Sequence, residues 1–239
     1  MNKKPDVSLI LPCFNETDVF DQSVRSILHA LSSSAYTYEI IFVDDKSLDQ
    51  TRAHIREVCR VHPFCFSVFH AKNKGRGAAV DTGIHHARAD VVGYIDIDCE
   101  VSPLYIPHFV KILQSHEADI VIGRRIYRTT RVSLVREVLS IGYRALAKFL
   151  LGTGGMDTET GYKFFNKRVF YPVLQSIQNQ GWFWDTESIV RSLKAGLRVR
   201  EEPVLFVRRG DKHSSVKIIP DTIEYLKNIW VFYWQIRTA

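Results

Sequence analysis

Two aspartates separated by one residue are the groups in this chain best suited to chemistry. Asp96 and Asp98 follow directly after the apolar segment Val91–Ile95. In an extended chain alternate side chains point the same way, so both carboxylates should face one side while Ile97 faces the other. Paired carboxylates favour Mg²⁺ or Mn²⁺, which share their coordination shell with substrate phosphates, and Glu100 is a candidate third ligand. The alternative is that one aspartate caps a helix and the other is solvated.

Two further segments have the composition of a nucleotide site. The pair Asp44-Asp45 ends the apolar segment Tyr38–Val43, and a carboxylate there can accept hydrogen bonds from a base or a ribose, or cap the next helix. The segment Lys72–Gly77 combines glycines with cations at the start of a helix, which favours a diphosphate and makes Lys74 a candidate ligand. A solvated turn is the alternative. The spacing matches neither a Walker A motif nor a dinucleotide-binding fingerprint.

Alternating strands and helices must position these groups. Apolar runs predict strands, and apolar residues at helical spacing predict the intervening helices. The strands are predicted at Val7–Leu11, Tyr38–Val43, Phe64–Phe69, Val91–Ile95 and Asp119–Ile122. This alternation predicts an α/β fold with a Rossmann-like, mostly parallel sheet flanked by helices. Ligands of such sheets bind at the carboxyl ends of the strands, where the acidic pairs lie.

In the second half of the chain the regular alternation of strands and helices ends, and the pattern predicts a C-terminal elaboration of helices and strands. Helices are predicted at Ser133–Leu151, from Lys167, at Trp184–Ala195 and from Ile219, with strands at Lys163–Asn166 and Arg198–Val207. We predict a catalytic domain over residues 1–215, followed at 216–239 by an amphipathic helix associated with a membrane.

Composition and charge exclude several classes of protein. Of the 239 residues, 46% are hydrophobic and 24% charged, which is ordinary for a globular domain and excludes collagen, coiled coil and disorder. The net charge of +6 is concentrated in the stretches 124–148 and 198–217, which predicts a phosphate-bearing partner. Nucleic acid is not expected, because carboxylates at strand ends repel a phosphate backbone.

Targeting signals and cysteines predict the compartment. No apolar leader precedes the first strand, and no stretch approaches the roughly 20 apolar residues of a membrane span. Four scattered cysteines indicate reduced thiols. We therefore expect a cytoplasmic protein. Aromatic residues near the C-terminus, among them Trp230 and Trp234, favour peripheral contact with the cytoplasmic face of a membrane, or cover the sheet instead.

A basic stripe runs along the predicted helix Ser133–Leu151. Arg136, Ser140, Arg144 and Lys148 recur every four residues and so share one side of that helix, beside apolar residues. Such a stripe fits a phosphate joined to a hydrocarbon chain, or an interfacial helix. An ordinary solvated basic face is the alternative.

The order of motifs resembles the family-2 glycosyltransferases with a GT-A fold. Within them it resembles the dolichyl-phosphate mannose synthases and dolichyl-phosphate β-glucosyltransferases. The segments that carry the resemblance are Leu11–Glu16, Ile41–Ser47, Gly75–Ala78, Tyr94–Asp98, Asp119–Arg125, Asp157–Lys163 and Gly181–Glu187. The resemblance covers roughly residues 7 to 215, almost the whole chain.

The resemblance implies roles for individual residues. The nucleotide-sugar pocket would contain Pro12, Phe14, Glu16, Val43, Asp45, Ile95, Asp96 and Ile97. Asp96 and Asp98 match the metal and sugar-nucleotide site, and Glu100 stands where relatives often have glutamine. Arg125, Arg136, Ser140 and Arg209 match positions that engage the donor diphosphate or the acceptor phosphate.

The activity implied is inverting, metal-dependent transfer of a hexose from UDP-glucose or GDP-mannose to a polyisoprenyl phosphate. The motif Gly-Glu-Ser-Lys of the mannose synthases is replaced here by Lys212–Ser215, which puts a mannose donor in doubt. A membrane-anchoring partner is an open expectation. The nearest alternative is transfer to a glycan hydroxyl, with Asp185 or Glu187 as general base.

Overall fold

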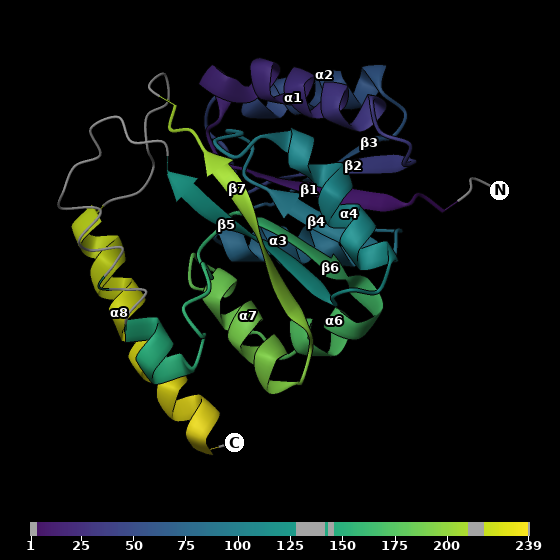
Figure 1. Cartoon of the computed structure of the whole chain (residues 1–239). Helices are drawn as coiled ribbons and strands as arrows, with labels where there is room; N and C mark the ends of the chain where they lie inside the picture. Colours follow the sequence, from purple (N-terminus) through teal and green to yellow (C-terminus); the bar gives the residue numbers. More distant parts are fainter. Residues whose placement is uncertain (1–3, 128–141, 143–145, 210–217, 239) are drawn as a thin grey trace.

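A seven-stranded sheet runs through the computed structural model, which describes residues 4–127, 142, 146–209 and 218–238 (Figure 1). Its strands lie in the order β3-β2-β1-β4-β6-β5-β7. In chain order they are β1 (Val7–Cys13), β2 (Tyr38–Asp44), β3 (Cys65–Phe69), β4 (Val91–Ile95), β5 (Ile120–Tyr127), β6 (Tyr162–Asn166) and β7 (Val199–Phe206).

One strand runs against the others. β1 pairs in parallel with β2 and β4, β2 with β3, and β5 with β7, whereas β6 is antiparallel to both β4 and β5. Every residue of β1 and β4 is buried, as expected for strands covered on both faces. The predicted mostly parallel α/β sheet is confirmed. The position of β6 inside the sheet was not predicted.

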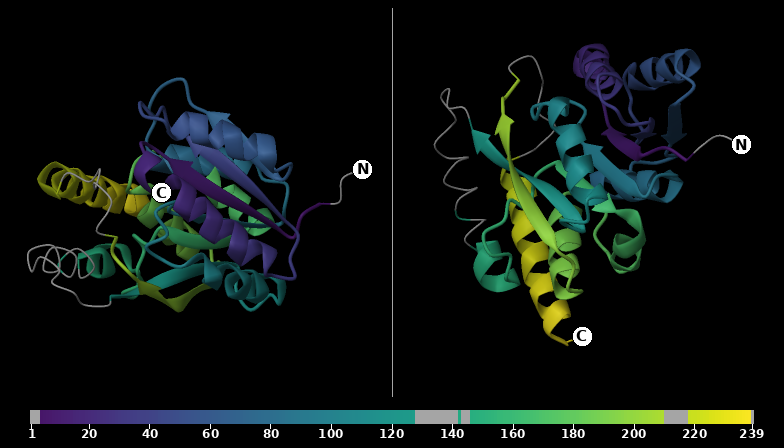
Figure 2. Two further views of the ribbon diagram at one scale, coloured as in Figure 1. Left: turned by 90° about the horizontal axis from the view of Figure 1, so that it is seen from above. Right: turned by 45° about the vertical axis from the view of Figure 1, so that its right-hand side comes forward.

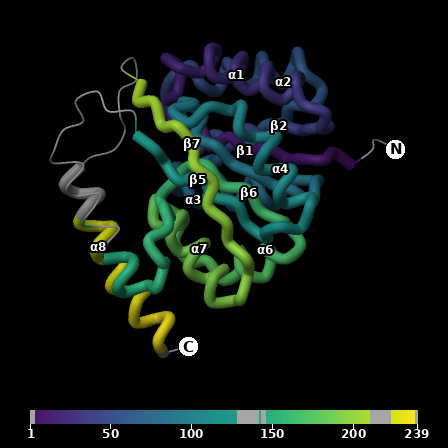
Figure 3. The backbone as a smooth tube through the Cα atoms, in the orientation of Figure 1, coloured from purple at the N-terminus to yellow at the C-terminus, as the bar shows by residue number. Residues whose placement is uncertain are grey.

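Helices cover both faces of the sheet, as Figures 1 and 3 show. One core joins the sheet to α1 (Thr17–Ser32), α2 (Thr51–Val61) and α4 (Ile106–Gln114). The other joins it to α3 (Arg76–His86), α6 (Lys167–Leu174) and α7 (Trp184–Lys194). The α1 helix shows why: its residues Phe20, Val24, Ile27 and Leu31 recur at helical spacing and are buried.

The C-terminal helix α8 (Ile218–Thr238) packs on the side of α7 (Figure 2). Ile229 and Phe232 of α8 form a small third core with Phe183, Val190 and Leu151. Other apolar side chains of α8 are exposed, namely Ile223, Leu226, Trp230, Val231 and Trp234. Within the described parts of the chain, no helix combines the length and apolar character needed to cross a bilayer.

The predicted elements that fall on described residues agree with the structure to within a few residues, apart from two elements that were not predicted and one strand that was predicted too short. The 3₁₀ turn Pro103–Tyr105 and α4 were not predicted. The predicted helix Ser133–Leu151 lies largely outside the described residues, although 146–151 are helical. The strand Asp119–Ile122 was predicted too short, since β5 continues to Tyr127 as an exposed extension paired with β7.

Candidate functional site

Unusual backbone conformations mark the carboxyl edge of the sheet. Asn15, Lys46 and Cys99 follow the ends of β1, β2 and β4, and their φ angles are 55°, 68° and 54°. These values lie in the left-handed region, which non-glycine residues rarely adopt, and such residues concentrate at functional sites. Three neighbouring strands therefore end in strained turns at one edge.

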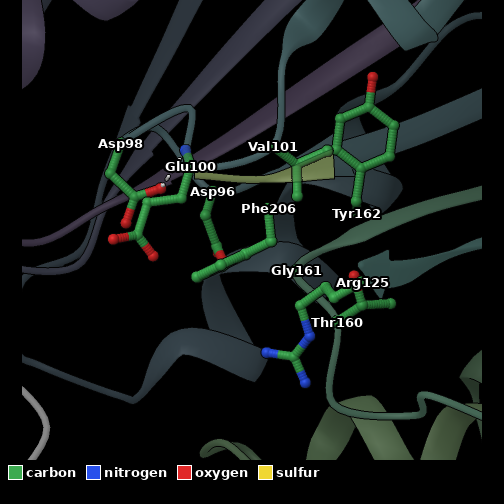
Figure 4. Close-up of a pocket in the computed structure, with 9 residues that line it drawn as sticks. All are labelled: Asp96, Asp98, Glu100, Val101, Arg125, Thr160, Gly161, Tyr162 and Phe206. Carbon is green, nitrogen blue, oxygen red and sulfur yellow. Dashed lines mark hydrogen bonds between the residues drawn. The ribbon is translucent and has the colours of Figure 1, made fainter. Parts of the chain in front are cut away.

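A pocket at this edge contains the predicted acidic groups. Asp96, Asp98 and Glu100 come from the turn after β4, and Arg125 comes from β5 (Figure 4). Asp98 and Glu100 lie side by side, and the Arg125 guanidinium lies below them in this view. The remaining lining residues are Val101, Thr160, Gly161, Tyr162 and Phe206. The structure thus brings Asp96 and Asp98 to one cavity, as predicted. The expected alternation of an extended chain is not the reason, because β4 ends at Ile95 and a turn follows, in which the Cys99 amide donates to the Asp96 carbonyl oxygen.

Gly161 provides the surface on which the Asp96 carboxylate rests. The Asp96 amide donates to the Gly161 carbonyl oxygen over 3.0 Å. A Cβ atom on Gly161 would lie only 1.8 Å from Asp96 Oδ2, a distance at which one of the two must move. A side chain at position 161 is therefore incompatible with the present position of Asp96.

Asp96 belongs to a charged network that extends into the core. Arg76 donates through Nε and Nη2 to Asp96 Oδ1, at 2.9 and 2.5 Å, and through Nη1 to Asp185 Oδ2 at 2.6 Å. Asp185 also accepts from the Tyr94 hydroxyl and, at 3.1 Å, from Lys163 Nζ. Two acids are thus matched by two bases, which is how buried charges are normally tolerated.

Burial shifts the pKa values of this network. The Lys163 side chain is fully buried, and burial lowers its pKa, while the neighbouring Asp185 acts in the opposite direction. Burial also acts to lower the pKa of Arg76, but Asp185 and Asp96 outweigh it and hold this pKa well above its ordinary value. Arg76 therefore stays charged.

The donor set at the pocket fits a divalent cation. Its carboxylates are hard oxygen ligands, and Asp98 Oδ1 accepts from the Glu100 amide over 3.2 Å. Thr160 lines the pocket, and its buried hydroxyl has no hydrogen-bond partner among the described residues. Within those residues, however, no three acidic, histidine or cysteine side chains are grouped closely enough to enclose a metal. The predicted shell of Asp96, Asp98 and Glu100 is therefore not assembled in this structure.

The segment after β7 contacts the turn that carries Glu100. The Arg209 amide donates to Glu100 Oε1 at 3.1 Å, and Arg209 Nη2 donates to Gln22 Oε1 at 2.6 Å. The Val207 amide donates to the Glu100 carbonyl oxygen at 2.8 Å. Arg209 therefore lies beside the acidic turn, more than 100 residues away in sequence.

Arg125 is held by a bidentate ion pair. Its Nε and Nη2 donate to the two oxygens of Asp157 at 2.8 and 2.7 Å, and its amide donates at 3.1 Å. Burial acts to raise the pKa of Asp157, but the Arg125 charge and hydrogen bonds outweigh it and lower this pKa below its ordinary value. Asp157 therefore fixes the guanidinium at the pocket wall.

Apart from Asp96, the predicted nucleotide-sugar residues lie outside the described pocket. The side chains of Pro12, Val43, Ile95 and Ile97 are buried, so these residues can present only backbone to a ligand. Phe14 and Glu16 are partly exposed, and Lys74 is exposed. Asp45 is buried and accepts from the amides of Lys74 and Gly75 at 2.8 and 2.7 Å, and its Oδ1 lies 2.7 Å from His70 Nδ1.

The glycines at the start of α3 are packed against other parts of the protein, and the space beside them is not free for a diphosphate. A Cβ on Gly75 would lie 2.5 Å from the Gln180 carbonyl oxygen, and one on Gly77 would lie 2.4 Å from Trp184 Cβ. The Ala78 amide donates to that same Gln180 oxygen. The amide cradle predicted for Lys72–Gly77 is thus already used by Asp45 and by the loop before α7.

The two candidate general bases are enclosed, which contradicts that role in this conformation. Asp185 and Glu187 are each 2% exposed, and both oxygens of each accept hydrogen bonds. Those of Glu187 accept from Arg191 Nε and from the amides of Gln178 and Asn179. Glu187 pairs with Arg191, and Asp185 belongs to the buried network of Arg76 and Lys163.

Three predicted acceptor residues, Arg136, Ser140 and Arg144, lie outside the described residues. Lys148, the fourth member of that stripe, is exposed beside Phe149, which is 87% exposed. Sequence reasoning missed Arg76, Lys163 and Gly161 as components of the site. The motif Thr160-Gly161-Tyr162 was recognised as part of the resemblance, but nothing in its spacing indicated that it packs under Asp96.

Comparison with known proteins identifies related sequences. The model of the family described as glycosyl transferase family 2 matches residues 8–174. Glycosyltransferase AglD of Haloferax volcanii is 29% identical over 237 residues, which cover 97% of this chain and 37% of AglD. Dolichyl-phosphate beta-glucosyltransferase ALG5A of Trichomonas vaginalis is 27% identical over 246 residues, covering 97% of this chain and 76% of the relative. This chain thus spans well under half of AglD, but most of ALG5A.

Solved structures share the fold. Glucosyl-3-phosphoglycerate synthase of Mycobacterium tuberculosis, solved with Mn²⁺, UDP and glucosyl-3-phosphoglycerate, matches with a TM-score of 0.70 and 18% identity, covering 92% of this chain and 77% of that one. TarS of S. aureus, solved with UDP-GlcNAc, matches with a TM-score of 0.61 and 16% identity, covering 94% and 65%. These neighbours confirm the predicted GT-A fold.

Proposed function

The chain belongs to glycosyl transferase family 2, and from that premise we propose that it transfers a hexose from a sugar nucleotide to a polyisoprenyl phosphate. Relatives named as dolichyl-phosphate beta-glucosyltransferases support this acceptor and favour glucose over mannose. UDP in structural neighbours supports UDP-glucose as donor, ahead of GDP-mannose.

One observation carries the proposal. Acidic groups able to hold a cation and a cation able to bind phosphate line the same pocket, with Asp96 and Asp98 on one side and Arg125 on the other. A sugar nucleotide needs both, because its diphosphate is anionic and must be neutralised as it leaves. The pocket lies at the carboxyl edge of the strands, where ligands of such sheets bind.

Asp96 and Asp98 would hold Mg²⁺ or Mn²⁺, with Glu100 as a further ligand. A bound divalent cation supplies positive charge opposite the leaving diphosphate. Arg125 and Arg209 add the protein's own positive charge; Arg125 is fixed at the pocket wall by Asp157, and Arg209 is tied to Glu100. Both guanidiniums stay protonated throughout the physiological pH range.

The reaction we propose is a single in-line displacement with inversion at the anomeric carbon. The bond from that carbon to the diphosphate oxygen breaks, and an oxygen of the acceptor phosphate forms the new bond. A phosphate monoester has a second pKa of about 6 and is largely dianionic at neutral pH, so it needs no general base. The enclosure of Asp185 and Glu187 is consistent with such an acceptor.

Helix α8 supports a membrane-surface role for the C-terminal segment 216–239, appended to a catalytic domain over 1–215. Trp230 and Trp234 are 57% and 49% exposed, and Ile223 is 62% exposed. Exposed aromatic and apolar side chains of this kind favour the headgroup level of a bilayer. A lipid acceptor would be reached from that surface, with or without an anchoring partner.

The test is a donor screen against polyprenyl phosphate, with UDP-glucose and GDP-mannose compared in the presence and absence of EDTA. We expect chloroform-extractable labelled sugar from UDP-glucose, abolished by EDTA and restored by Mn²⁺. Transfer unchanged in EDTA would contradict the metal role. Transfer to a glycan with none to lipid would contradict the acceptor.

A further inference from the structure

Arg76 occupies a fixed place between the pocket and the core. It is the first residue of α3, directly after Gly75, whose φ is 102°. Its guanidinium lies 5.3 Å from the centre of the Tyr94 ring and 5.2 Å from that of Trp182. The side chain is only 10% exposed. Aromatic contacts on a buried guanidinium hold it in one orientation.

The two carboxylates that Arg76 joins differ in accessibility. The Asp185 side chain is 3% exposed and is also bound by Tyr94 and Lys163. The Asp96 side chain is 41% exposed and lines the pocket. The contact with Asp185 is therefore an internal anchor, whereas the contact with Asp96 lies where a ligand can reach it.

We propose that Arg76 is a built-in counter-cation for Asp96, and that a divalent metal must take this carboxylate from it. The inference rests on the proposed function, because it requires Asp96 to be a metal ligand. Arg76 is then a positioning residue that keeps Asp96 folded over Gly161 before the metal binds. Its anchor on Asp185 remains when the contact with Asp96 is given up.

The charge balance gives the physical reason. Asp96 and Asp185 carry two negative charges, and Arg76 and Lys163 carry two positive ones. A metal approaching this balanced group meets no net attraction from it, and it must replace two charge-assisted hydrogen bonds to Asp96. Without Arg76 the group would carry one net negative charge, while Lys163 would still neutralise Asp185. Removing the arginine should therefore strengthen metal binding.

The displaced arginine acquires a second use. Its Nε and Nη2 donors, released from Asp96, would lie beside the pocket in which the donor diphosphate is expected. Metal binding would thus free a phosphate-binding guanidinium. Arg76 would lower the affinity for the metal but raise the affinity for the nucleotide. This predicts opposite effects of one substitution on two ligands.

The experiment measures binding of Mn²⁺, and separately of UDP with saturating Mn²⁺, to the full chain by isothermal titration calorimetry. For Arg76→Met we expect Mn²⁺ to bind about tenfold more tightly without nucleotide, equivalent to about 1.4 kcal/mol, and UDP to bind more weakly. Arg88→Met is the matched control, because Arg88 pairs with a buried carboxylate, Glu39, away from the pocket. It should change neither affinity.

Mn²⁺ affinity that is unchanged or weakened in Arg76→Met would overturn the inference. Loss of local structure would weaken Mn²⁺ binding, so tighter binding separates the proposed role of Arg76 from a merely structural one. Arg76→Gln, which keeps hydrogen-bond donors but not the charge, serves if the methionine variant does not fold. Wild-type protein offers a readout without substitution at Arg76: Mg²⁺ should alter Trp182 fluorescence, and Trp182→Phe should abolish the change. Mg²⁺ that binds without altering emission would also overturn it.

Failure of the proposed function looks different. If wild-type protein binds no Mn²⁺ even with UDP present, the metal role itself is wrong and the inference falls with it. If wild type binds Mn²⁺ and Asp98→Asn does not, but Arg76→Met leaves the affinity unaltered, only the inference about Arg76 is wrong.

Discussion

Each edge of the sheet has a carboxylate paired with an arginine, and the two carboxylates differ in how accessible they are. At the amino edge, Glu39 accepts from the Ser8 hydroxyl and from the amide and Nε of Arg88. At the carboxyl edge, Asp96 accepts from Arg76. Glu39 is 1% exposed, whereas the Asp96 side chain is 41% exposed. The Glu39 carboxylate is enclosed and joins strands, although Arg88 is 47% exposed, whereas the Asp96 carboxylate is open to a ligand.

The backbone shows the same contrast. The carboxyl edge contains Asn15, Lys46 and Cys99 in left-handed conformations, which cost free energy, whereas no described non-glycine residue beside Glu39 has a positive φ. Hydrogen bonds at the amino edge lock Ser8 between Glu39 and the Ala89 amide. An ion pair alone is therefore a poor guide to function. The accessibility of the carboxylate and the backbone strain beside it distinguish the two pairs, although His116, before β5, also has a positive φ of 59°.

The largest expected effect is on catalysis at the open edge. Asp98→Asn removes one negative charge from the pocket and keeps the shape of a side chain that is partly exposed. We expect turnover to fall about a hundredfold to a thousandfold, as for loss of a group that stabilises charge in the transition state. The melting temperature should stay within about 2 °C. Initial rates and thermal melts test this, and a large loss of stability would contradict the contrast.

Gly161→Ala should reproduce much of that loss without touching a charged residue. The added methyl would lie 1.8 Å from Asp96 Oδ2, so the carboxylate must move, and misplacement by about 1 Å can cost about a hundredfold in rate. Gly181→Ala is the control, because its methyl would meet only Asn179 Oδ1, at 3.5 Å. Comparable rates in the two variants would show that Asp96 does not depend on Gly161.

Glu39→Gln should have the opposite profile. It weakens a buried, charge-assisted group of hydrogen bonds, and we expect the free energy of unfolding to fall by about 2 kcal/mol. Turnover below the melting temperature should stay within about twofold of wild type. Urea unfolding and initial rates measure the two quantities. A Glu39→Gln variant with wild-type stability but no activity would contradict the view that the Glu39 pair serves stability and the Asp96 pair serves function.

The smallest expected effect concerns the thiol between Asp98 and Glu100. Burial raises the pKa of Cys99 to about 12, so almost no thiolate forms at pH 8, and the native protein should resist iodoacetamide there. The raised pKa adds stability that is complete below the ordinary thiol pKa and is lost as pH rises toward the folded value. Peptide mass spectrometry of labelled protein tests this. Fast labelling would show that the turn opens.

The sequence was sufficient for what depends on nearby residues. The order of strands and helices in the first half and the position of Asp44-Asp45 follow from spacings of a few residues. Asp96 and Asp98 line one pocket as predicted, but a turn after β4 places them there instead of an extended chain. The motif order added the family. Strand pairing beyond the first half did not follow, because β6 inserts between β4 and β5 from a segment that begins 67 residues after β4 ends.

The rest of the site depends on contacts between distant segments. Arg76 meets Asp96 across 20 residues and Asp185 across 109. The glycines at 75 and 77 suggested a phosphate cradle, but the loop before α7 fills that space. Asp185 had the residue type of a general base, and only its enclosure by Tyr94, Lys163 and Arg76 argues against that role. Residue type predicts which chemistry is available, and burial decides whether it is used.

The reversal of β6 has a consequence for how this enzyme can diversify. Because β6 begins beside the end of β4, with Tyr162 opposite Ile95, the chain enters the sheet at the edge where its other strands leave it. The segment from Asp157 to Gly161, just ahead of β6, therefore reaches the pocket, where Thr160 and Gly161 line the wall and Asp157 holds Arg125. Substitutions in this segment can reshape the pocket while the residues up to Asp98 stay as they are.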